Sequence, residues 1–137
     1  FISFDDVNFM PEMSRYCGEI LTINRVVEVF GQYLMSECDY SRLRVAPCRY
    51  YGSIKTDNLV ICAHNYKSHF GYIGELSLDS MVMFTDMEGT KNMYTVTSVE
   101  ILHPTDTELV KDTGDDLILY TCTYSGRTRI VVRCTEI

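Results

Sequence analysis

A short stretch around residue 125 brings a thiol and a guanidinium group within reach of each other. In "LYTCTYSGRTRIVVR", two β-rich runs flank Ser125-Gly126, where we expect a tight two-residue turn with a positive φ at Gly126. Such a turn pairs Cys122 with Arg129 on one face, about 5 Å apart at Cβ, and a four-residue loop with the same centre keeps the pairing. A permanent cation beside a thiol lowers the thiol pKa. The stretch therefore predicts a reactive Cys122.

A cysteine nucleophile also needs a proton shuttle, and the chain offers three histidines. His64 ends the apolar run in "VICAHNY", where a rigid strand would hold it while it reaches solvent or substrate. His69 and His103 lie in loop-like sequence, and we expect them to be solvated surface residues. The predicted site is therefore His64, Cys122 and Arg129. The alternative is a packed cysteine beside a histidine that merely ends a strand.

Most of the remaining sequence is typical of β-strands. Strands are expected at residues 19–23, 26–30, 58–63, 81–85, 94–102, 117–124 and 127–136. Ser36 resembles the N-cap of a short helix ending before Pro47, and the spacing of Phe70, Ile73 and Leu76 indicates a helical turn. Residues 103–116 form a polar loop. Seven or eight strands with one or two short helices favour an all-β, closed eight-stranded barrel.

The two faces of the last hairpin differ in composition. The apolar face is expected in the core and comprises Leu117, Leu119, Ile130, Val132 and Cys134. The mixed face comprises Ile118, Tyr120, Cys122, Arg129, Val131 and Arg133. Alternation of this kind predicts that one face is buried and the other partly open.

Composition limits the classes of function. The 137 residues suit one domain over 1–137 with a real core. A net charge of −7 without a basic stripe argues against binding to nucleic acid. The sequence contains no run of about 18 apolar residues, so it predicts no membrane span. Because the chain starts at Phe1 rather than Met, we expect an N-terminal anchor or signal segment to be missing from it.

The metal and disulfide signals are weak. The six cysteines stand at 17, 38, 48, 62, 122 and 134, without a C-x-x-C pair. Disulfides stay possible for an exported protein, although Cys122 and Cys134 lie on opposite faces, and burial as small apolar residues is the plainer alternative. Cys62, His64 and His69 make an incomplete metal set. The acidic residues of the 103–116 loop favour a solvated loop over calcium; they are Asp112, Asp115 and Asp116. We predict no metal and no cofactor.

Three motifs in this order resemble the sortases, the cysteine transpeptidases of Gram-positive cell surfaces. "ILYTC" (118–122) is similar to the family's T-L-x-T-C signature, with Ile118 in place of the first Thr. "TRIVVR" (128–133) is similar to the strand that bears the family's arginine. "VICAHNY" (60–66) is similar to its histidine motif, with Ala63 where Gly is common, and "YYGS" (50–53) also resembles the family. The resemblance covers roughly residues 49–137.

The resemblance implies an eight-stranded barrel and a function. Cys122 would cleave a sorting signal of the L-P-x-T-G type between Thr and Gly, forming a thioacyl-enzyme that an amine of a peptidoglycan precursor or a pilin lysine resolves. It further implies that His64 transfers protons and that Arg129 holds substrate or oxyanion. Tyr120 and Thr121 would bind substrate, and the 103–116 loop would shape its recognition. The family works on the extracellular face of the membrane through an N-terminal anchor.

Two other functions stay open. A papain-like hydrolase requires a Cys at a helix start and an Asn or Asp to orient the His, whereas Cys122 is predicted on a strand. Hydrolysis of the sorting signal itself is expected only where no amine arrives. The second function that stays open is a non-catalytic β-barrel binding module in which Cys122 is merely packed.

Overall fold

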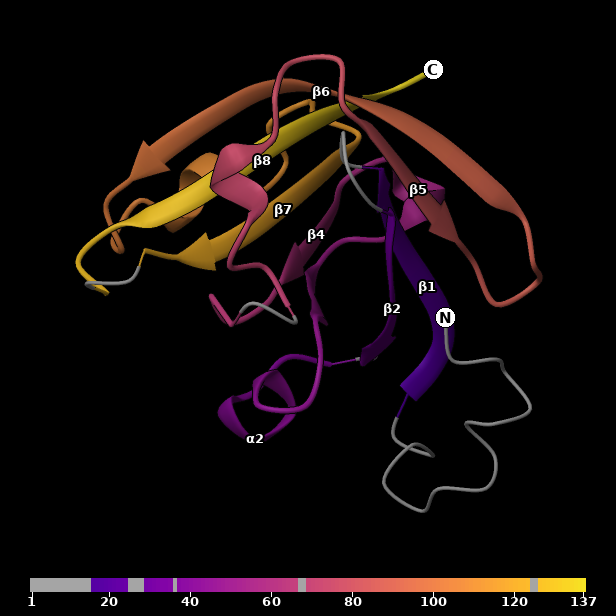
Figure 1. Cartoon of the computed structure of the whole chain (residues 1–137), viewed down its shortest axis with the longest axis horizontal. Helices are drawn as coiled ribbons and strands as arrows, with labels where there is room; N and C mark the ends of the chain where they lie inside the picture. Colours follow the sequence, from indigo (N-terminus) through magenta and orange to yellow (C-terminus); the bar gives the residue numbers. More distant parts are fainter. Residues whose placement is uncertain (1–15, 25–28, 36, 67–68, 124–125) are drawn as a thin grey trace.

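The computed structural model describes residues 16–24, 29–35, 37–66, 69–123 and 126–137. Within these residues, eight strands close into a barrel in the order β1-β2-β3-β4-β7-β8-β6-β5, which confirms the expected fold class (Figure 1). The strands are β1 (Tyr16–Asn24), β2 (Val29–Met35), β3 (Cys48–Tyr51), β4 (Leu59–Cys62), β5 (Met81–Thr85), β6 (Lys91–Leu102), β7 (Leu117–Cys122) and β8 (Arg129–Glu136).

Three neighbouring strands of this barrel run through the predicted site. Strand β4 pairs with β7 in parallel, from Leu59 opposite Leu117 to Cys62 opposite Tyr120. Strand β7 pairs with β8 antiparallel, and its last pair is Cys122 with Arg129. The expected register of the final hairpin is therefore confirmed.

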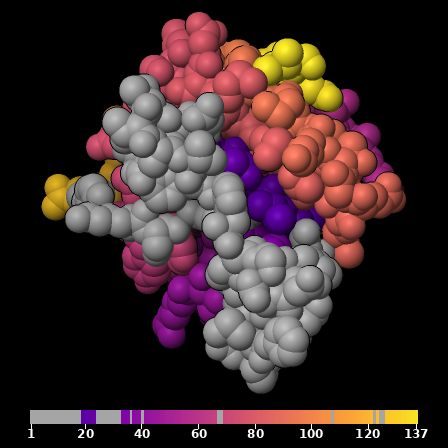
Figure 2. Space-filling model, turned by 45° about the vertical axis from the view of Figure 1, so that its right-hand side comes forward, coloured from indigo at the N-terminus to yellow at the C-terminus, as the bar shows by residue number. Residues whose placement is uncertain are grey.

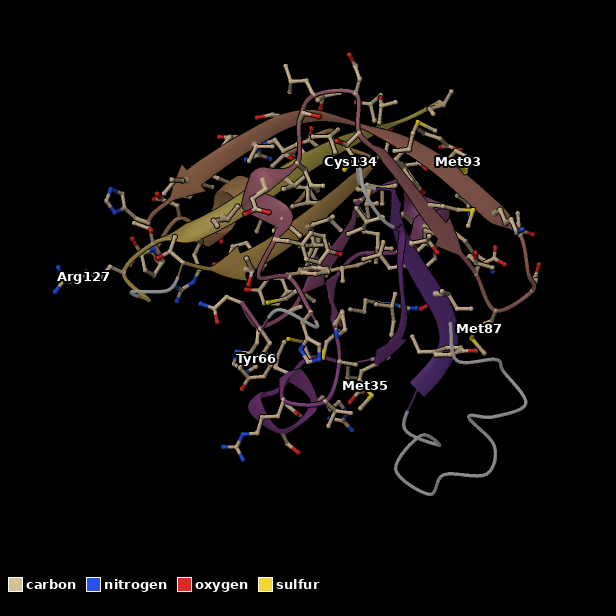
Figure 3. The ribbon with its side chains drawn as sticks, viewed as in Figure 1. Met35, Tyr66, Met87, Met93, Arg127 and Cys134 are labelled. Atoms are coloured by element: carbon tan, nitrogen blue, oxygen red, sulfur yellow. The ribbon has the colours of Figure 1, made fainter. Side chains whose placement is uncertain are left out.

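The barrel core contains the face of the hairpin that was expected there. Leu117, Leu119, Val132 and Cys134 are fully buried, and Ile130 packs against the same cluster. Cys134 lies inside the barrel wall in Figure 3. Large apolar side chains from the other strands fill the same core, among them Leu21, Ile23, Ile61, Val82, Phe84 and Tyr94. Burial of this many apolar groups is the main force that closes the barrel.

The mixed face of the hairpin is more covered than its sequence suggests. Ile118 and Val131 are buried in a second apolar cluster with Val60 and Val110. Val110 belongs to the 3₁₀ turn η4 (Thr107–Val110), which lies inside the loop that was expected to be polar throughout. The loop therefore places an apolar residue over the middle of this face, and only the ends of the face remain partly open.

The short helical segments agree with the sequence in place but not in every detail. Helix α2 (Tyr40–Leu43) forms where it was expected, but its N-cap is Asp39 rather than Ser36. Asp39 is extended and accepts a hydrogen bond from the Arg42 amide at 2.7 Å. The described residues also contain the 3₁₀ turns η2 (Ile54–Thr56) and η3 (Ile73–Glu75). Turn η3 confirms the expected helical turn.

Two strands differ from the sequence expectation. The second strand spans Val29–Met35 instead of residues 26–30, and the short strand β3 was not expected. β3 has only four residues, too few for alternation to be read, and it is held by its pairing with β4. In the space-filling view, β1 (indigo) lies beside the orange β5–β6 hairpin, as their pairing requires (Figure 2). Among the described residues, no helix has the length and apolar character needed to cross a membrane.

Candidate active site

The backbone brings His64, Cys122 and Arg129 into one row across three strands. The β4–β7 pairs end with Cys62 opposite Tyr120, and the Ala63 amide extends the ladder by donating to the Tyr120 carbonyl at 3.1 Å. His64 follows the end of β4 by two residues, and Cys122, the last residue of β7, follows Tyr120 by two. Cys122 is opposite Arg129 on the other side. Because adjacent strands lie about 4.8 Å apart, Cys122 and Arg129 are direct neighbours in the sheet, and His64 follows the end of the strand on the other side of β7.

Two side-chain hydrogen bonds fix the His64 segment on strand β7. The Thr121 hydroxyl donates to the Ala63 carbonyl at 2.7 Å, and the Asn65 amide donates to the Thr123 carbonyl at 3.1 Å. They bracket His64 on both sides. These bonds fix the position of the His64 backbone along strand β7, which carries Cys122.

Thr121 is buried, with 1% of its surface exposed, on the core face of β7. Its observed contact is with the Ala63 backbone, so it acts on the site by positioning the segment that carries His64. Direct contact with substrate, the role that the sequence suggested, stays a prediction. The bond itself explains why a hydroxyl is tolerated among the apolar residues of the core.

The three histidines have different surroundings. His64 is half-buried, and its ring lies 4.8 Å from that of Tyr66. His69 is buried, so the expectation that it is a solvated surface residue is wrong: its amide turns back to the Tyr66 carbonyl, and its ring lies 5.3 Å from Tyr66. Burial lowers the pKa of His69 and favours its neutral form. His103 is exposed, as expected.

Arg129 lies half-buried at the start of β8. Its Nη1 donates to the carbonyls of Gly126 and Thr128, each at 3.1 Å. Gly126 has φ +72°, as the turn requires, and the Thr123 amide donates to the Thr128 carbonyl at 3.1 Å. Tyr124 and Ser125, the other residues of the expected turn, lie outside the described part of the chain. Among the described residues, no ion pair joins Arg129 to a carboxylate.

Comparison with known proteins identifies the class to which this arrangement belongs. A family model described as the sortase domain matches residues 22–137. The chain belongs to the sortase family. A search of curated protein sequences finds no match for it.

Solved structures of sortases share the fold. Sortase C1 of group B Streptococcus pilus island 1 is 18% identical with a TM-score of 0.73, over 87% of this chain and 64% of its own. Sortase A from Corynebacterium diphtheriae is 18% identical with a TM-score of 0.72, over 98% and 69%. Sortase C from Streptococcus pneumoniae is 19% identical with a TM-score of 0.75, over 92% and 70%. This chain thus spans less than two thirds of the first of these structures.

An aromatic patch borders the row in this sortase. Tyr120 stacks on Tyr50, with ring centroids 5.9 Å apart and planes 8° from parallel. The Lys111 ammonium lies 5.6 Å from the Tyr50 ring and 5.4 Å from the Tyr51 ring. Burial raises the pKa of the Tyr120 hydroxyl, and the charge of nearby Arg129 partly offsets this. Tyr120 therefore stays a neutral hydrogen-bonding group near the guanidinium; a role in substrate binding stays a prediction.

The loop between β6 and β7 is fastened at the other end of the same face. Arg133 donates to Asp115 at 2.8 Å and to the Leu109 carbonyl at 2.6 Å, and its Nε bonds to Glu100. These partners raise the pKa of the Arg133 guanidinium against the opposing effect of burial. Arg133 therefore joins β6, β8 and the loop, and its charge is compensated.

The three aspartates of this loop each have a separate partner. Asp115 binds Arg133, Asp116 accepts from the Glu136 amide at 2.7 Å, and Asp112 accepts from the Asn58 amide at 2.8 Å and from the Tyr51 hydroxyl. Within the described residues, no group of carboxylates, thiols and imidazoles is arranged to hold a metal ion. The carboxylates instead fasten the loop to the barrel.

A pocket of about 530 Å³ lies elsewhere in the molecule. It is lined by Glu19, Arg49, Ser53, Ile54, Lys55, Asp86, Met87 and Glu88. Glu19 is buried and binds Arg49 at 2.6 Å, so the polar lining is internally paired. None of the five predicted site residues lines this pocket, and the candidate site therefore rests on the row of β4, β7 and β8.

Proposed function

We propose that this sortase is a cysteine transpeptidase that cleaves an L-P-x-T-G-like sorting signal between Thr and Gly and transfers the acyl group to an amine. The observation that supports it most is the pairing of Cys122 with Arg129, with His64 just past the end of the neighbouring strand β4. A nucleophile, a proton-transfer group and a cation side by side are what acyl transfer from a peptide requires. Motifs of the family lie at the same three positions.

In the first half of the reaction, the Cys122 thiolate attacks the Thr carbonyl of the sorting signal. A tetrahedral intermediate forms, the bond from Thr to Gly breaks, and His64 gives a proton to the departing Gly amine. The product is a thioester between Cys122 and the Thr acyl group. In the second half, an incoming amine attacks the thioester, His64 takes its proton, and the thiolate is released.

Arg129 supplies positive charge and hydrogen-bond donors at the carbonyl that reacts. Its guanidinium bonds backbone carbonyls of its own turn and interacts with Tyr120, and among the described residues it forms no ion pair, so substrate can replace those contacts without breaking one. A donor placed where negative charge develops lowers the barrier of the reaction, and a planar fork serves this better than a single ammonium group.

The natural partners follow from the same proposal. The substrate is the sorting signal of secreted surface proteins, and the acceptor amine belongs to a peptidoglycan precursor or a pilin lysine. One similar structure, the pneumococcal sortase C, is described in terms of pilin substrate specificity. The enzyme would act at the extracellular face of the membrane, held by an N-terminal anchor. No cofactor and no metal enter the reaction.

The direct test is mass spectrometry of a sorting peptide incubated with the protein, with and without triglycine as the amine. We expect the triglycine-ligated product from the native protein, a thioester adduct of the peptide on Cys122, and neither product from Cys122→Ala. Cys134→Ser, which changes a thiol on the opposite face, should retain the activity in the folded fraction.

The other outcomes assign the alternatives. Hydrolysed peptide as the only product, even in excess triglycine, would make the protein a cysteine peptidase. Binding of the peptide without turnover, with Cys122 no more reactive than a free model thiol, would make it a binding module. Either result contradicts the proposal.

A further inference from the structure

Three cysteines gather at one end of the barrel, apart from Cys122 in the sequence. Cys48 and Cys62 are directly opposite each other in the β3–β4 pair. Cys38 lies between β2 and α2 and packs against the apolar cluster of Met35, Ala46 and Cys48. The Cys48 thiol donates to the Ala46 carbonyl at 3.3 Å inside this cluster. Figure 3 locates this end of the barrel by its label on Met35, near α2.

The three thiols differ in access and in charge. Cys48 is fully buried, whereas Cys38 and Cys62 are half-buried, and none of the three is in a disulfide. Hydrogen bonds from Cys48 and Cys62 lower the pKa of Cys38 to about 4, against burial and the charge of Asp39; the charge of His64 adds a smaller effect in the same direction. The hydrogen bond to Cys38 raises the pKa of Cys48. These shifts favour the thiolate at the more accessible Cys38 and the protonated thiol at the buried Cys48.

We propose that Cys38 and Cys48 form a redox site in which a peroxide oxidises Cys38 and Cys48 then closes a disulfide with it. In the first step, the Cys38 thiolate attacks a peroxide oxygen, the O–O bond breaks, and Cys38 becomes a sulfenic acid with release of hydroxide. In the second step, the Cys48 sulfur displaces the sulfenic oxygen, which leaves as water. Two thiols lose two electrons in total, and one peroxide is reduced to two waters.

The buried position of Cys48 suits the second step. External oxidants do not reach a residue with no exposed surface, so its sulfur reacts only with a neighbour. The interaction with Cys38, burial and the negative charge of a Cys38 thiolate all raise the pKa of Cys48. Oxidation of Cys38 to a neutral sulfenic acid removes that charge. Formation of the sulfenic acid therefore activates the thiol that resolves it.

The arrangement also distinguishes Cys48 from Cys62 as the resolving residue. Cys48 belongs to the same packed cluster as Cys38, with Met35 and Ala46 around both sulfurs. Cys62 is opposite Cys48 on the neighbouring strand, at the end of the strand that leads to His64, and is not part of that cluster. A disulfide to Cys48 keeps Cys38 in its present cluster. One to Cys62 would join Cys38 to a residue outside that cluster.

The test uses the full chain with Cys122→Ala, so that no proposed nucleophile consumes oxidant. The protein is treated with one equivalent of hydrogen peroxide, free thiols are alkylated, and trypsin digestion is followed by mass spectrometry. Cleavage after Lys and Arg places the three cysteines on separate peptides, 26–42, 45–49 and 56–67. We expect a cross-link of 26–42 with 45–49, and alkylated Cys62. Cys62→Ser should form the same cross-link at a rate within about twofold.

Two further variants separate the steps. Cys38→Ser should lower disulfide formation at least tenfold, and Cys48→Ser should leave Cys38 as a sulfenic acid that dimedone traps. Circular dichroism checks that each variant is folded. A cross-link of Cys48 with Cys62, or of Cys38 with Cys62, would overturn the assignment. Complete alkylation of all three cysteines after peroxide would overturn the redox site itself. These outcomes do not depend on transpeptidase activity.

Discussion

Arg129 and Arg133 lie four residues apart on the same face of β8, yet their surroundings are opposite. Arg133 binds two carboxylates and a carbonyl and fastens the β6–β7 loop. Arg129 donates to two carbonyls of its own turn and, among the described residues, forms no ion pair. The charge of Arg133 is balanced by carboxylates, whereas Arg129, the partner of Cys122 in the sheet, has no carboxylate partner among the described residues.

From this difference we predict that Arg133 contributes to the stability of the fold and Arg129 to the reaction. Several charge-assisted bonds converge on a side chain that is only 14% exposed at Arg133, which favours the folded state. A cation without a carboxylate contributes little to folding, but its field is available to a developing oxyanion. The two arginines therefore predict two kinds of mutant effect from the same strand.

The largest loss of activity is expected from His64→Ala, at the same end of the hairpin face as Arg129. Without the proton-transfer group, kcat should fall by about 10²–10⁴ while the melting temperature stays near that of the native protein. His103→Ala is the matched control, because His103 is exposed and should leave kcat unchanged. The measurement is transfer of a sorting peptide to triglycine. Equal losses in the two variants would remove His64 from the proposed row.

Arg133→Lys should act on stability instead. A lysine keeps the charge but cannot reach Glu100, Asp115 and the Leu109 carbonyl together, so about 2 kcal/mol of unfolding free energy should be lost. Urea denaturation measures this. The activity of the folded fraction should stay within about tenfold of the native value. An unchanged denaturation midpoint would show that the contacts of Arg133 with the loop do not contribute to the free energy of unfolding.

A smaller effect on both quantities is expected from Thr121→Val, because Thr121 joins β7 to the segment of His64. The substitution leaves the Ala63 carbonyl without its 2.7 Å partner in the core, which should cost about 1–2 kcal/mol of stability. It should also lower kcat more than it changes KM, since His64 loses a positional constraint. Thr135→Val, at an exposed site on β8, is the control. A loss confined to KM would favour the substrate contact that the sequence suggested.

Local rules were enough to predict the strand pairing on which the candidate site depends. Alternation along the final hairpin and the Gly126 turn fix the pairing of Cys122 with Arg129, and the apolar run up to Ala63 places His64 at a strand end. The neighbour relation of β4 and β7 is not local, because 58 residues separate Leu59 from Leu117 in the chain. The resemblance of the motifs, rather than periodicity, suggested it.

Tertiary contacts explain the expectations that were wrong. His69 is in loop-like sequence, but the turn from Tyr66 folds it inward, and no periodicity predicts that. Ser36 and Asp39 both suit an N-cap, and Asp39 has the extended backbone and the bond to Arg42. Arg133 shares a face with Arg129 in the sequence, and periodicity does not predict that it is paired, because Glu100 and Asp115 come from other parts of the chain.

The most direct test of the account is the rate of peptide transfer by Arg129→Lys beside that of Arg127→Lys. Arg127 is exposed and projects from the hairpin tip away from the barrel, so its variant is a matched control (Figure 3). We predict that kcat/KM falls by about 10²–10³ for Arg129→Lys, with the fold intact by circular dichroism, and stays unchanged for Arg127→Lys. A value for Arg129→Lys within about threefold of the native enzyme, less than 1 kcal/mol in barrier height, would contradict the account.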